Sequence, residues 1–335
     1  MKMGIRNGLL DLGAVLAGQF TSADLSIFHE FEPPPTGGGH QFLRAFRMQA
    51  EMHGLRVENN IISRTTRACL FNSFNFNEKR LQRTRRSSVL YVHRVDGPIG
   101  VYRGWDDGVD GSIHAANQRY ADKTIFQSRY SLEKHLELGM QFRKPVIIMN
   151  AADPHIFHAR GRAGFSSDRK TRLIASSWSD NPNKGALVYQ WLDENLDWAR
   201  FEMTFVGRSP VAFKNIYMMP AVDSFRMADL FRRHDIYLTA SRNDPCSNSL
   251  IEALTCGLPA IYLQSGGHPE IVGQAGAGFD MAEQIPGLLE QIVKNYRAVQ
   301  SIISVPSMAQ VSELYLQTLE LMDDQPIDPN RRINK

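Results

Sequence analysis

Two carboxylates and a predicted helix start give the C-terminal half of the chain its clearest chemistry. Asp244 and Glu252 are separated by seven residues. The apolar run 235–240 predicts a buried parallel strand, and Asn248 predicts the cap of a helix that Gly257 ends. A helix start at the carboxyl end of a strand offers unpaired N–H groups to an anion. Acids together with backbone N–H groups suit a phosphorylated sugar.

A second junction between a strand and a helix follows directly. Residues 258–263 predict the next strand, Gly266 and Gly267 predict a tight turn, and residues 268–272 predict the first turn of another helix. Open parallel sheets bind their ligands outside the carboxyl ends of the strands. We therefore expect both junctions to converge at one edge of a sheet.

The segment 241–272 resembles the donor-binding signature of glycosyltransferase family 4, whose members are retaining sugar transferases with the GT-B fold. The likeness rests on Asp244, Glu252-Ala253, Gly257, Pro259 and the turn Gly266-Gly267-x-Pro269-Glu270. The family usually has Glu at the first acidic position, and Asp244 is one methylene shorter. The resemblance implies that Asp244 faces the donor sugar and that Glu252 holds the ribose hydroxyls. For Asp244 alone, an ordinary acid before a helix is the alternative.

Lys184 is predicted to lie at the same edge, because it follows a predicted strand at 172–176 and opens a helix. Family members usually place an Arg shortly before the Lys-Gly pair, and both residues neutralise the leaving diphosphate. Here residues 177–179 are Ser-Trp-Ser. Either another base such as Arg208 substitutes, or neutralisation is weaker. The alternative for Lys184 is a solvated lysine at a helix start.

Three consecutive glycines, 37–39, follow the first predicted strand and precede a helix. Their spacing is not the dinucleotide fingerprint, so a flexible turn is one interpretation. By position they resemble the family's glycine loop near the donor phosphates, which makes Gly38 and Gly39 predicted donor contacts. The other predicted donor contacts are Ser247, Asn248 and Ser249 at the helix start and, by resemblance, Met219 near the base.

The acceptor side is predicted from the end of another strand. His93 follows the apolar residues 89–92 and is expected to close that strand at its carboxyl end. Family members often carry a His near the reacting sugar at this place, whereas a buried structural histidine is the alternative. Arg94, Asp96 and Arg103 are predicted to shape the acceptor pocket.

The resemblance implies transfer of a sugar from a nucleoside diphosphate sugar to a hydroxyl with retained configuration, in cell-surface polysaccharide or glycoconjugate synthesis. Lys184 and the helix dipole would stabilise the leaving diphosphate, Asp244 would orient the sugar and His93 would hydrogen-bond near it. Neither a metal nor another cofactor is expected. A nucleotide-sugar epimerase-like enzyme and a catalytically inactive nucleotide-sugar-binding protein remain alternatives on the same fold.

The length of 335 residues predicts two domains, and alternating strands and helices predict an α/β fold. We expect the GT-B architecture, with two Rossmann-like, doubly wound parallel-sheet domains facing a central cleft. The predicted parts are an acceptor-side domain at 1–152, a linker at 153–171, a donor domain at 172–305 and a helix at 306–325 that packs back on the first domain. The predicted strands of the first domain are 24–30, 57–62, 89–93, 124–127 and 145–149.

Charge is unevenly distributed along the chain. The first 150 residues hold 20 of the 38 Lys and Arg but 14 of the 35 Asp and Glu. A basic cluster at 79–86 predicts contact with anionic lipid headgroups or a phosphorylated acceptor, unless it is a solvated face. Nucleic acid is not an expected partner. Three cysteines and no long apolar run predict a cytoplasmic protein, peripheral at the inner membrane face if the cluster binds lipid.

Overall fold

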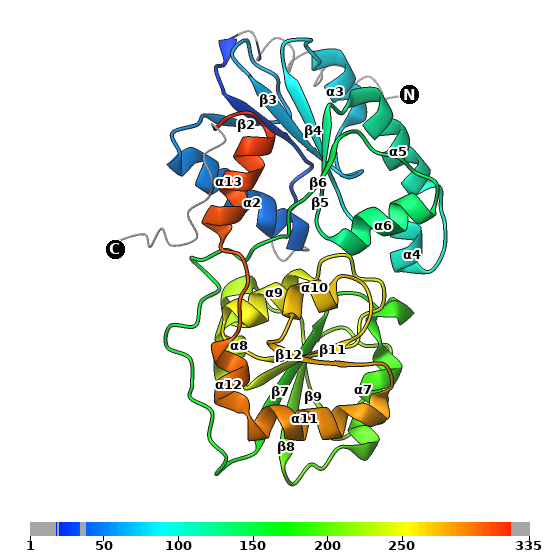
Figure 1. The fold of residues 1–335 in the computed structure, drawn as a ribbon, viewed down its shortest axis with the longest axis vertical. Coiled ribbons are helices and arrows are strands. Elements are labelled where there is room, and N and C mark those ends of the chain that lie inside the picture. The colour runs from blue at the N-terminus through cyan, green and yellow to red at the C-terminus, as the bar shows by residue number, and fades with distance from the viewer. Residues whose placement is uncertain (1–17, 19, 34–37, 323–335) are drawn as a thin grey trace.

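The computed structural model describes residues 18, 20–33 and 38–322. In that part of the chain two six-stranded sheets form, and every strand pair within them is parallel. Each sheet belongs to one lobe of the molecule, and the two lobes are stacked along its long axis (Figure 1). The apolar segment 9–20, whose sequence favours an amphipathic helix, lies outside the described residues except for Gly18 and Phe20.

The first sheet has the strand order β2-β1-β3-β4-β5-β6. Its strands are β1 (Leu25–Phe28), β2 (Val57–Asn59), β3 (Ala68–Asn72), β4 (Leu90–Val95), β5 (Lys123–Phe126) and β6 (Pro145–Ile147). The helices between them are α2 (Gly38–Met52), α3 (Glu78–Thr84), α4 (Ile99–Arg103), α5 (Val109–Tyr120) and α6 (Arg129–Glu137).

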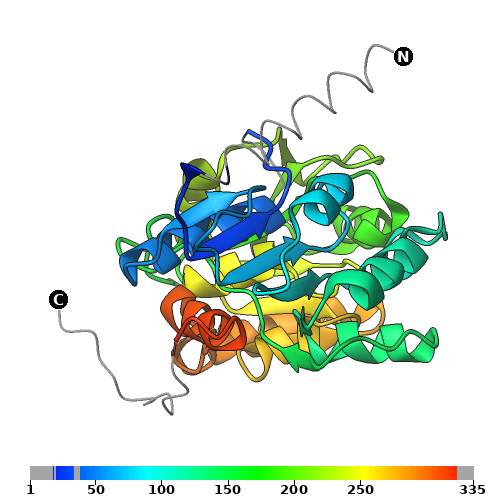
Figure 2. The same ribbon diagram turned by 90° about the horizontal axis from the view of Figure 1, so that it is seen from above.

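Alternate residues of these strands enter two separate cores. Leu70 and Val92 face the core under α2, whereas Phe71 and Tyr91 face the core under α3 and α5. A parallel strand that is covered on both faces is apolar throughout, which is why β3 is buried along its whole length. Seen from above, helices flank the first sheet on both sides (Figure 2).

The prediction of this sheet missed one strand. β3 lies between β1 and β4, and the run Ala-Cys-Leu-Phe-Asn that forms it is too short and too mixed to stand out from its polar surroundings. The predicted strand at 57–62 shortens to β2, because the chain leaves the sheet at Asn60, which adopts a φ of 54°. The predicted strand at 89–93 is in turn too short, since β4 runs on to Val95.

The second sheet has the strand order β12-β11-β10-β7-β8-β9. Its strands are β7 (Thr171–Ser177), β8 (Phe201–Gly207), β9 (Tyr217–Met219), β10 (Ile236–Thr239), β11 (Ala260–Leu263) and β12 (Gly276–Phe279). The helical elements are η1 (Pro182–Lys184), α7 (Ala186–Asn195), α8 (Ser224–Arg233), α9 (Asn248–Thr255), α10 (His268–Val272), η2 (Ala282–Gln284), α11 (Ile285–Lys294) and α12 (Tyr296–Ser301).

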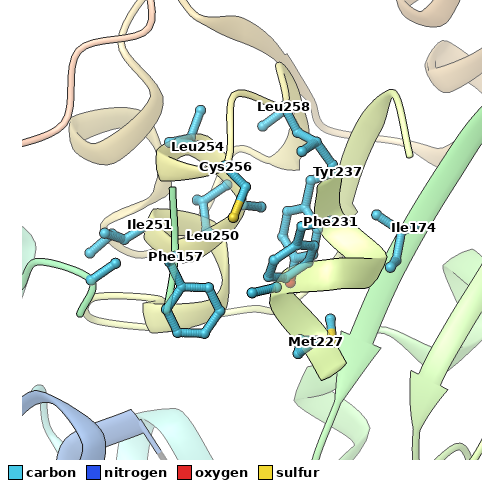
Figure 3. Close-up of a cluster of buried hydrophobic side chains, with 14 of the residues drawn as sticks. Phe157, Ile174, Met227, Phe231, Tyr237, Leu250, Ile251, Leu254, Cys256 and Leu258 are labelled. Atoms are coloured by element: carbon cyan, nitrogen blue, oxygen red, sulfur yellow. The ribbon is translucent and has the colours of Figure 1, made fainter. Parts of the chain in front are cut away.

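This sheet is also covered on both faces. One core joins α8 and α9 to the sheet through Phe231, Leu250 and Tyr237 (Figure 3). The other core joins α7 and α11 to the opposite face, with Leu192 and Leu289 among its members. The buried face of α9 therefore holds that helix firmly while its first turn stays at the carboxyl end of β10.

The chain finally returns to the first sheet. α13 (Met308–Thr318) packs against α2, and Tyr315 lies in the same core as Phe42 and Phe46. Its first turn is closed by a capping box between Ser307 and Gln310. In the described part of the chain no helix is long and apolar enough to cross a membrane.

Candidate active site

Three loops at the carboxyl edge of the second sheet pack backbone against backbone. Gly185 adopts a φ of 79°, and a Cβ there would collide with the carbonyl of Ala240. Gly266 adopts a φ of 66°, and a Cβ there would collide with the backbone of Asp244. The N–H of Gly267 donates to the Asp244 carbonyl over 2.9 Å. The Gly-Gly turn thus fixes the loop that carries the first acid, because no larger residue fits.

Lys184 and Asp244 meet in this corner. Lys184 Nζ lies 3.2 Å from Asp244 Oδ2, and both side chains are largely buried. The ammonium also lies 4.9 Å from the centre of the Tyr102 ring, which comes from α4 of the first domain. Burial by itself would lower the pKa of Lys184, but Asp244 and Tyr102 overcome that effect and raise it. Lys184 therefore keeps its positive charge over the ordinary pH range.

The first turn of α9 differs from its prediction in one respect. The capping position belongs to Ser247, and no side chain caps the helix. Asn248 instead turns toward the first domain, where its Oδ1 accepts a hydrogen bond of 3.0 Å from Asn150. Ser249 is held in place by the Tyr237 hydroxyl at 2.9 Å. The N–H groups of this turn are left without a side-chain acceptor, which is the condition for binding an anion.

Glu252 lies one turn further along α9. Its side chain is half-buried and forms no hydrogen bond or ion pair with any residue that the structure describes. Removal from water raises the pKa of Glu252 to about 8. A carboxyl group without a partner in such a place is costly to the fold, so it suits a ligand that donates hydrogen bonds.

The first domain approaches the acidic loop directly. Gly97, which follows β4, packs against the ring of Pro245, and a Cβ at Gly97 would clash with it. Asp96, just before Gly97, is part-exposed and accepts hydrogen bonds from Arg94 and Gln127. Asp96 therefore lies where the two domains meet, although nothing in its contacts assigns it to an acceptor.

Further polar contacts cross this junction from α4. Asn183 Nδ2 donates to the Tyr102 carbonyl over 2.9 Å, and Asn181 Nδ2 donates to the Arg103 carbonyl over 3.4 Å. The Arg103 side chain pairs with Asp107 at 2.7 Å. Arg103 is thus close to the Lys184 loop through its backbone, while its charge is paired with Asp107 in the loop between α4 and α5.

A carboxylate of the second domain also caps a helix of the first. The two oxygens of Glu270 accept from the N–H groups of Arg129 and Tyr130 over 2.9 and 2.8 Å. These groups belong to the first turn of α6, where a negative charge is favoured by the helix dipole. Glu270 belongs to the donor motif but had no predicted role, and Tyr102 was not predicted at all, because no local sequence pattern marks either contact.

The prediction for Arg94 is wrong. Arg94 is only 1% exposed. Its guanidinium donates to the side chains of Asn72, Asn150 and Tyr315 and lies 4.8 Å from the centre of the Phe42 ring. A residue with these buried partners cannot line an acceptor pocket. Arg94 was predicted to follow the strand, but it belongs to β4.

The prediction for His93 is wrong for the same reason. β4 continues beyond His93, and the ring is fully buried and stacked 4.2 Å from Phe71. Its Nε2 lies 3.0 Å from the Ser73 carbonyl, and its Nδ1 lies 3.2 Å from Asn117 Nδ2. Burial lowers the pKa of His93 to about 3. His93 is therefore a neutral structural histidine in this arrangement.

The remaining predicted contacts are spread around the same region. Gly38 begins α2 and packs against the side chain of Asn248, so the space beside it is already filled, whereas the space beside Gly39 is open. Arg208 is exposed and follows β8, the strand next to β7. Met219 ends the edge strand β9. Lys184, Asp244, Ser247, Asn248 and Gly38 are thus brought together, while Arg208 and Met219 lie on the neighbouring strands.

Neither a metal centre nor a second anion site is found in the described part of the chain. Among the described residues no group of three His, Cys, Asp or Glu side chains could hold a metal ion. A cavity of about 670 Å³ is lined by Arg162, Leu254 and Gly257. It lies at the opposite end of α9 from Asn248, where the helix presents carbonyl groups. Those carbonyls repel an anion, so this cavity does not suit a phosphate.

The fold and this site define a class of protein. The structure is similar to that of HepE of Anabaena, solved with UDP and glucose, with a TM-score of 0.65 at 14% identity, over 89% of this chain and 99% of HepE. A second similar structure is that of sucrose-phosphate synthase of Thermosynechococcus elongatus, with a TM-score of 0.56 at 16% identity, over 87% and 81%. The catalytic domain of starch synthase IV from Arabidopsis thaliana, bound to ADP and acarbose, has a TM-score of 0.58 at 13% identity, over 85% and 79%. The predicted GT-B fold is confirmed.

The family comparison is narrower and falls on the second domain. Residues 213–298, which include α9 and both acids, match the family model of glycosyl transferases group 1. A comparison with curated proteins finds no match. The predicted class, a glycosyltransferase, is therefore confirmed, and family 4 is compatible with this result.

Proposed function

We propose that the protein is a retaining hexosyltransferase that moves a sugar from a nucleoside diphosphate sugar to a hydroxyl acceptor. The observation that carries the proposal is the unpartnered carboxyl of Glu252 one turn beyond the open start of α9. A ribose offers two hydroxyl donors to such a group, and the phosphates that follow the ribose suit the helix start. The structures of HepE with UDP and with UDP-glucose support this class of donor.

The Lys184–Asp244 pair suits the two groups joined by the bond that breaks, which are the donor sugar and the diphosphate. In the proposed complex Asp244 accepts a hydrogen bond from a sugar hydroxyl, while Lys184 donates one to the neighbouring phosphate oxygen. Both groups already lie 3.2 Å apart, so they can contact adjacent parts of one donor. Lys184 and α9 stabilise the negative charge that develops on the departing diphosphate. The mechanism uses no metal ion.

Both domains carry exposed aromatic rings. Phe74 is 38% exposed, Trp105 56% and Trp178 42%. Phe74 follows β3 and its ring centre lies 6.0 Å from the Arg103 guanidinium, Trp105 follows α4, and Trp178 follows β7. Flat aromatic faces suit sugar rings, and we extend the proposal to a glycan or lipid-linked acceptor in cell-surface polysaccharide or glycoconjugate synthesis.

The test is calorimetric titration of UDP, GDP, ADP and CDP, with and without magnesium, into the wild type and Glu252→Ala. We expect one nucleotide to bind without metal, and Glu252→Ala to weaken it by about 10-fold or more, because a hydrogen bond to a charged group is lost. The exposed Glu283 on η2 provides the control Glu283→Ala, which should bind as the wild type does.

Three results would change the proposal. No binding of any nucleotide would reject it. Binding without turnover for every donor and acceptor would favour the inactive binding protein. Release of an epimerised nucleotide sugar without an acceptor would favour the epimerase-like alternative.

The basic cluster leads to a separate proposal, that the first domain binds anionic membrane. Lys79, Arg83, Arg85 and Arg86 are exposed on and just after α3. Each basic residue near an anionic surface contributes about 1 kcal/mol. We expect the protein to sediment with phosphatidylserine vesicles at low salt and to do so less after Lys79→Glu with Arg85→Glu. Arg297→Glu, an exposed change in the second domain, is the control. Equal sedimentation with neutral vesicles would contradict the proposal.

A further inference from the structure

Two histidines that the proposed mechanism does not use meet beside the first turn of α2. His29 follows β1 and is 1% exposed. His40 is the third residue of α2, and its Nδ1 lies 2.9 Å from His29 Nε2. The backbone of His29 is held on both sides by Asn60, which accepts from its N–H and donates to its carbonyl. The pair is therefore well fixed, and the positions of its protons can be worked out.

Arg94 decides the first of these positions. A guanidinium can only donate, so Asn72 Oδ1, 2.7 Å from Arg94 Nη1, must be the acceptor. The other side of the same amide, Asn72 Nδ2, then faces His29 Nδ1 at 3.3 Å and must donate. A flipped amide would place two donors face to face at Arg94. His29 consequently accepts at Nδ1 and carries its proton on Nε2.

Two donors then meet His40 at the same atom. His29 Nε2–H donates to His40 Nδ1, and the backbone N–H of Glu32, which can only donate, lies 3.4 Å from that Nδ1. Burial lowers the pKa of His40, and burial followed by the neighbouring His40 lowers that of His29 to about 4, so both rings are neutral at neutral pH. A neutral His40 must therefore carry its proton on Nε2. That N–H forms no hydrogen bond with any described residue.

A second arm of the same network reaches α9. Arg94 Nη2 donates to Asn150 Oδ1 over 2.9 Å, and Asn150 Nδ2 donates to Asn248 Oδ1 over 3.0 Å. Asn248 is left with its Nδ2 donors, which pack beside Gly38 at the start of α2. One chain of hydrogen bonds thus leads from Arg94 to His40 and the other from Arg94 to Asn248. Both end in N–H groups within one turn of the place where the starts of α2 and α9 touch (Figure 1).

We propose that His40 Nε2–H binds a terminal phosphate oxygen of the nucleoside diphosphate, and that Arg94 is a positioning residue that fixes this tautomer through Asn72 and His29. The inference rests on the proposed function. The start of α9, whose N–H groups no side chain caps, and a side-chain N–H donor on the first turn of α2 form surroundings that favour an anion over a neutral hydroxyl. Arg94 acts only through other residues, because its own donors are used inside the protein.

The test compares the nucleoside diphosphate that the wild type binds with the matching monophosphate, which lacks the terminal phosphate. His40→Phe keeps the ring shape but removes the donor, so we expect it to weaken diphosphate binding by about 10-fold or more and leave monophosphate binding unchanged. His40→Gln supplies an amide N–H near the place of Nε2 and should restore most of the loss. His53→Phe, at the exposed far end of α2, is the matched control.

The possible results separate the two proposals. Equal binding of diphosphate by His40→Phe and the wild type would overturn the inference and leave the proposed function standing. An equal loss for both nucleotides would also overturn it, because the contact would then lie at the ribose or base or be merely structural. Binding of neither nucleotide by the wild type would reject the proposed function, and the phosphate contact with it.

The tautomer is tested without any nucleotide. In the free protein labelled with ¹⁵N-histidine, long-range ¹H–¹⁵N spectra should show His40 protonated on Nε2 and not on Nδ1. Asn72→Leu removes the amide that orients His29 and should convert His40 to a mixture of both tautomers. It should also reproduce part of the diphosphate loss of His40→Phe. A wild-type His40 that carries its proton on Nδ1 would overturn the role of Arg94 whatever the protein binds.

Discussion

Replacement of Lys184 by Ala is expected to lower kcat by about 10²- to 10³-fold, with a much smaller change in the affinity for the nucleotide. Loss of one preorganised group that stabilises developing charge has an effect of this size in other enzymes. Lys184 is well placed for such a role, because it is part-buried, remains charged and already lies in the corner between α9 and the first domain. Initial rates with the donor found by calorimetry provide the measurement.

The controls for this prediction follow from the ion pair. Lys184→Ala leaves Asp244 without its partner, so the thermal midpoint of each variant must be measured alongside the rate. Lys184→Ala combined with Asp244→Asn removes the unpaired charge and should be at least as slow as the single variant. Lys294→Ala, an exposed change in the last turn of α11, should keep the wild-type rate. A Lys184→Ala variant with an unchanged kcat would show that the charge has no part in the chemistry.

The donor side of the site could be predicted because its residues are close in the sequence. Asp244, Glu252 and the Gly-Gly turn belong to one strand–helix–strand unit, and the acids, the helix start and the glycines each leave a local pattern. The structure also shows the role of that turn: Gly266 and Gly267 pack against the backbone of 244–245 and hold the loop that carries Asp244. The family match covers this same region.

The first domain was harder to predict, because an error in one strand changes which residues are expected at the end of that strand. β3 was missed and β4 was ended too early, so His93 and Arg94 were placed at a strand end when they lie inside the strand. Side chains in the middle of a strand that is covered on both faces are mostly buried. His93 then becomes a core residue and Arg94 the centre of a buried polar network.

Contacts across the junction leave no trace in local sequence patterns. Tyr102 meets Lys184 and Glu270 meets α6 only after both domains have folded and docked. The histidine pair is similar, since His29 and His40 come from opposite sides of a loop whose length says nothing of where they meet. Contacts of this kind can be found only in the three-dimensional structure.

The pH dependence of nucleotide binding provides the other large effect. In the free protein, burial raises the pKa of Glu252 to about 8 from an ordinary value near 4.5. A bound ribose donates to the ionised carboxylate and lowers that pKa again, so binding releases a proton at pH values between the lowered pKa and about 8. If the bound carboxyl has an ordinary pKa, the affinity should rise by about 50-fold between pH 6 and pH 8.

Glu252→Gln keeps the shape of the side chain and removes its titration. Calorimetry of both proteins at several pH values isolates the effect, because ionisation of the phosphate is common to both and cancels in the ratio of affinities. We expect the ratio of wild-type to variant affinity to rise with pH up to about 8 and then level off. A ratio that stays constant across this range would mean that the ribose does not contact Glu252.

The raised pKa of Glu252 predicts the opposite pH dependence for the stability of the free protein. A raised carboxyl pKa means that the folded state binds the proton more tightly than the unfolded state does, so its contribution to stability is present below about pH 4.5 and is lost as the pH rises to about 8. Glu252→Gln lacks this loss. The thermal midpoint of Glu252→Gln relative to that of the wild type should therefore increase with pH in the absence of nucleotide. With saturating nucleotide the wild type should have the higher thermal midpoint, since only the wild type has the charge that the ligand satisfies.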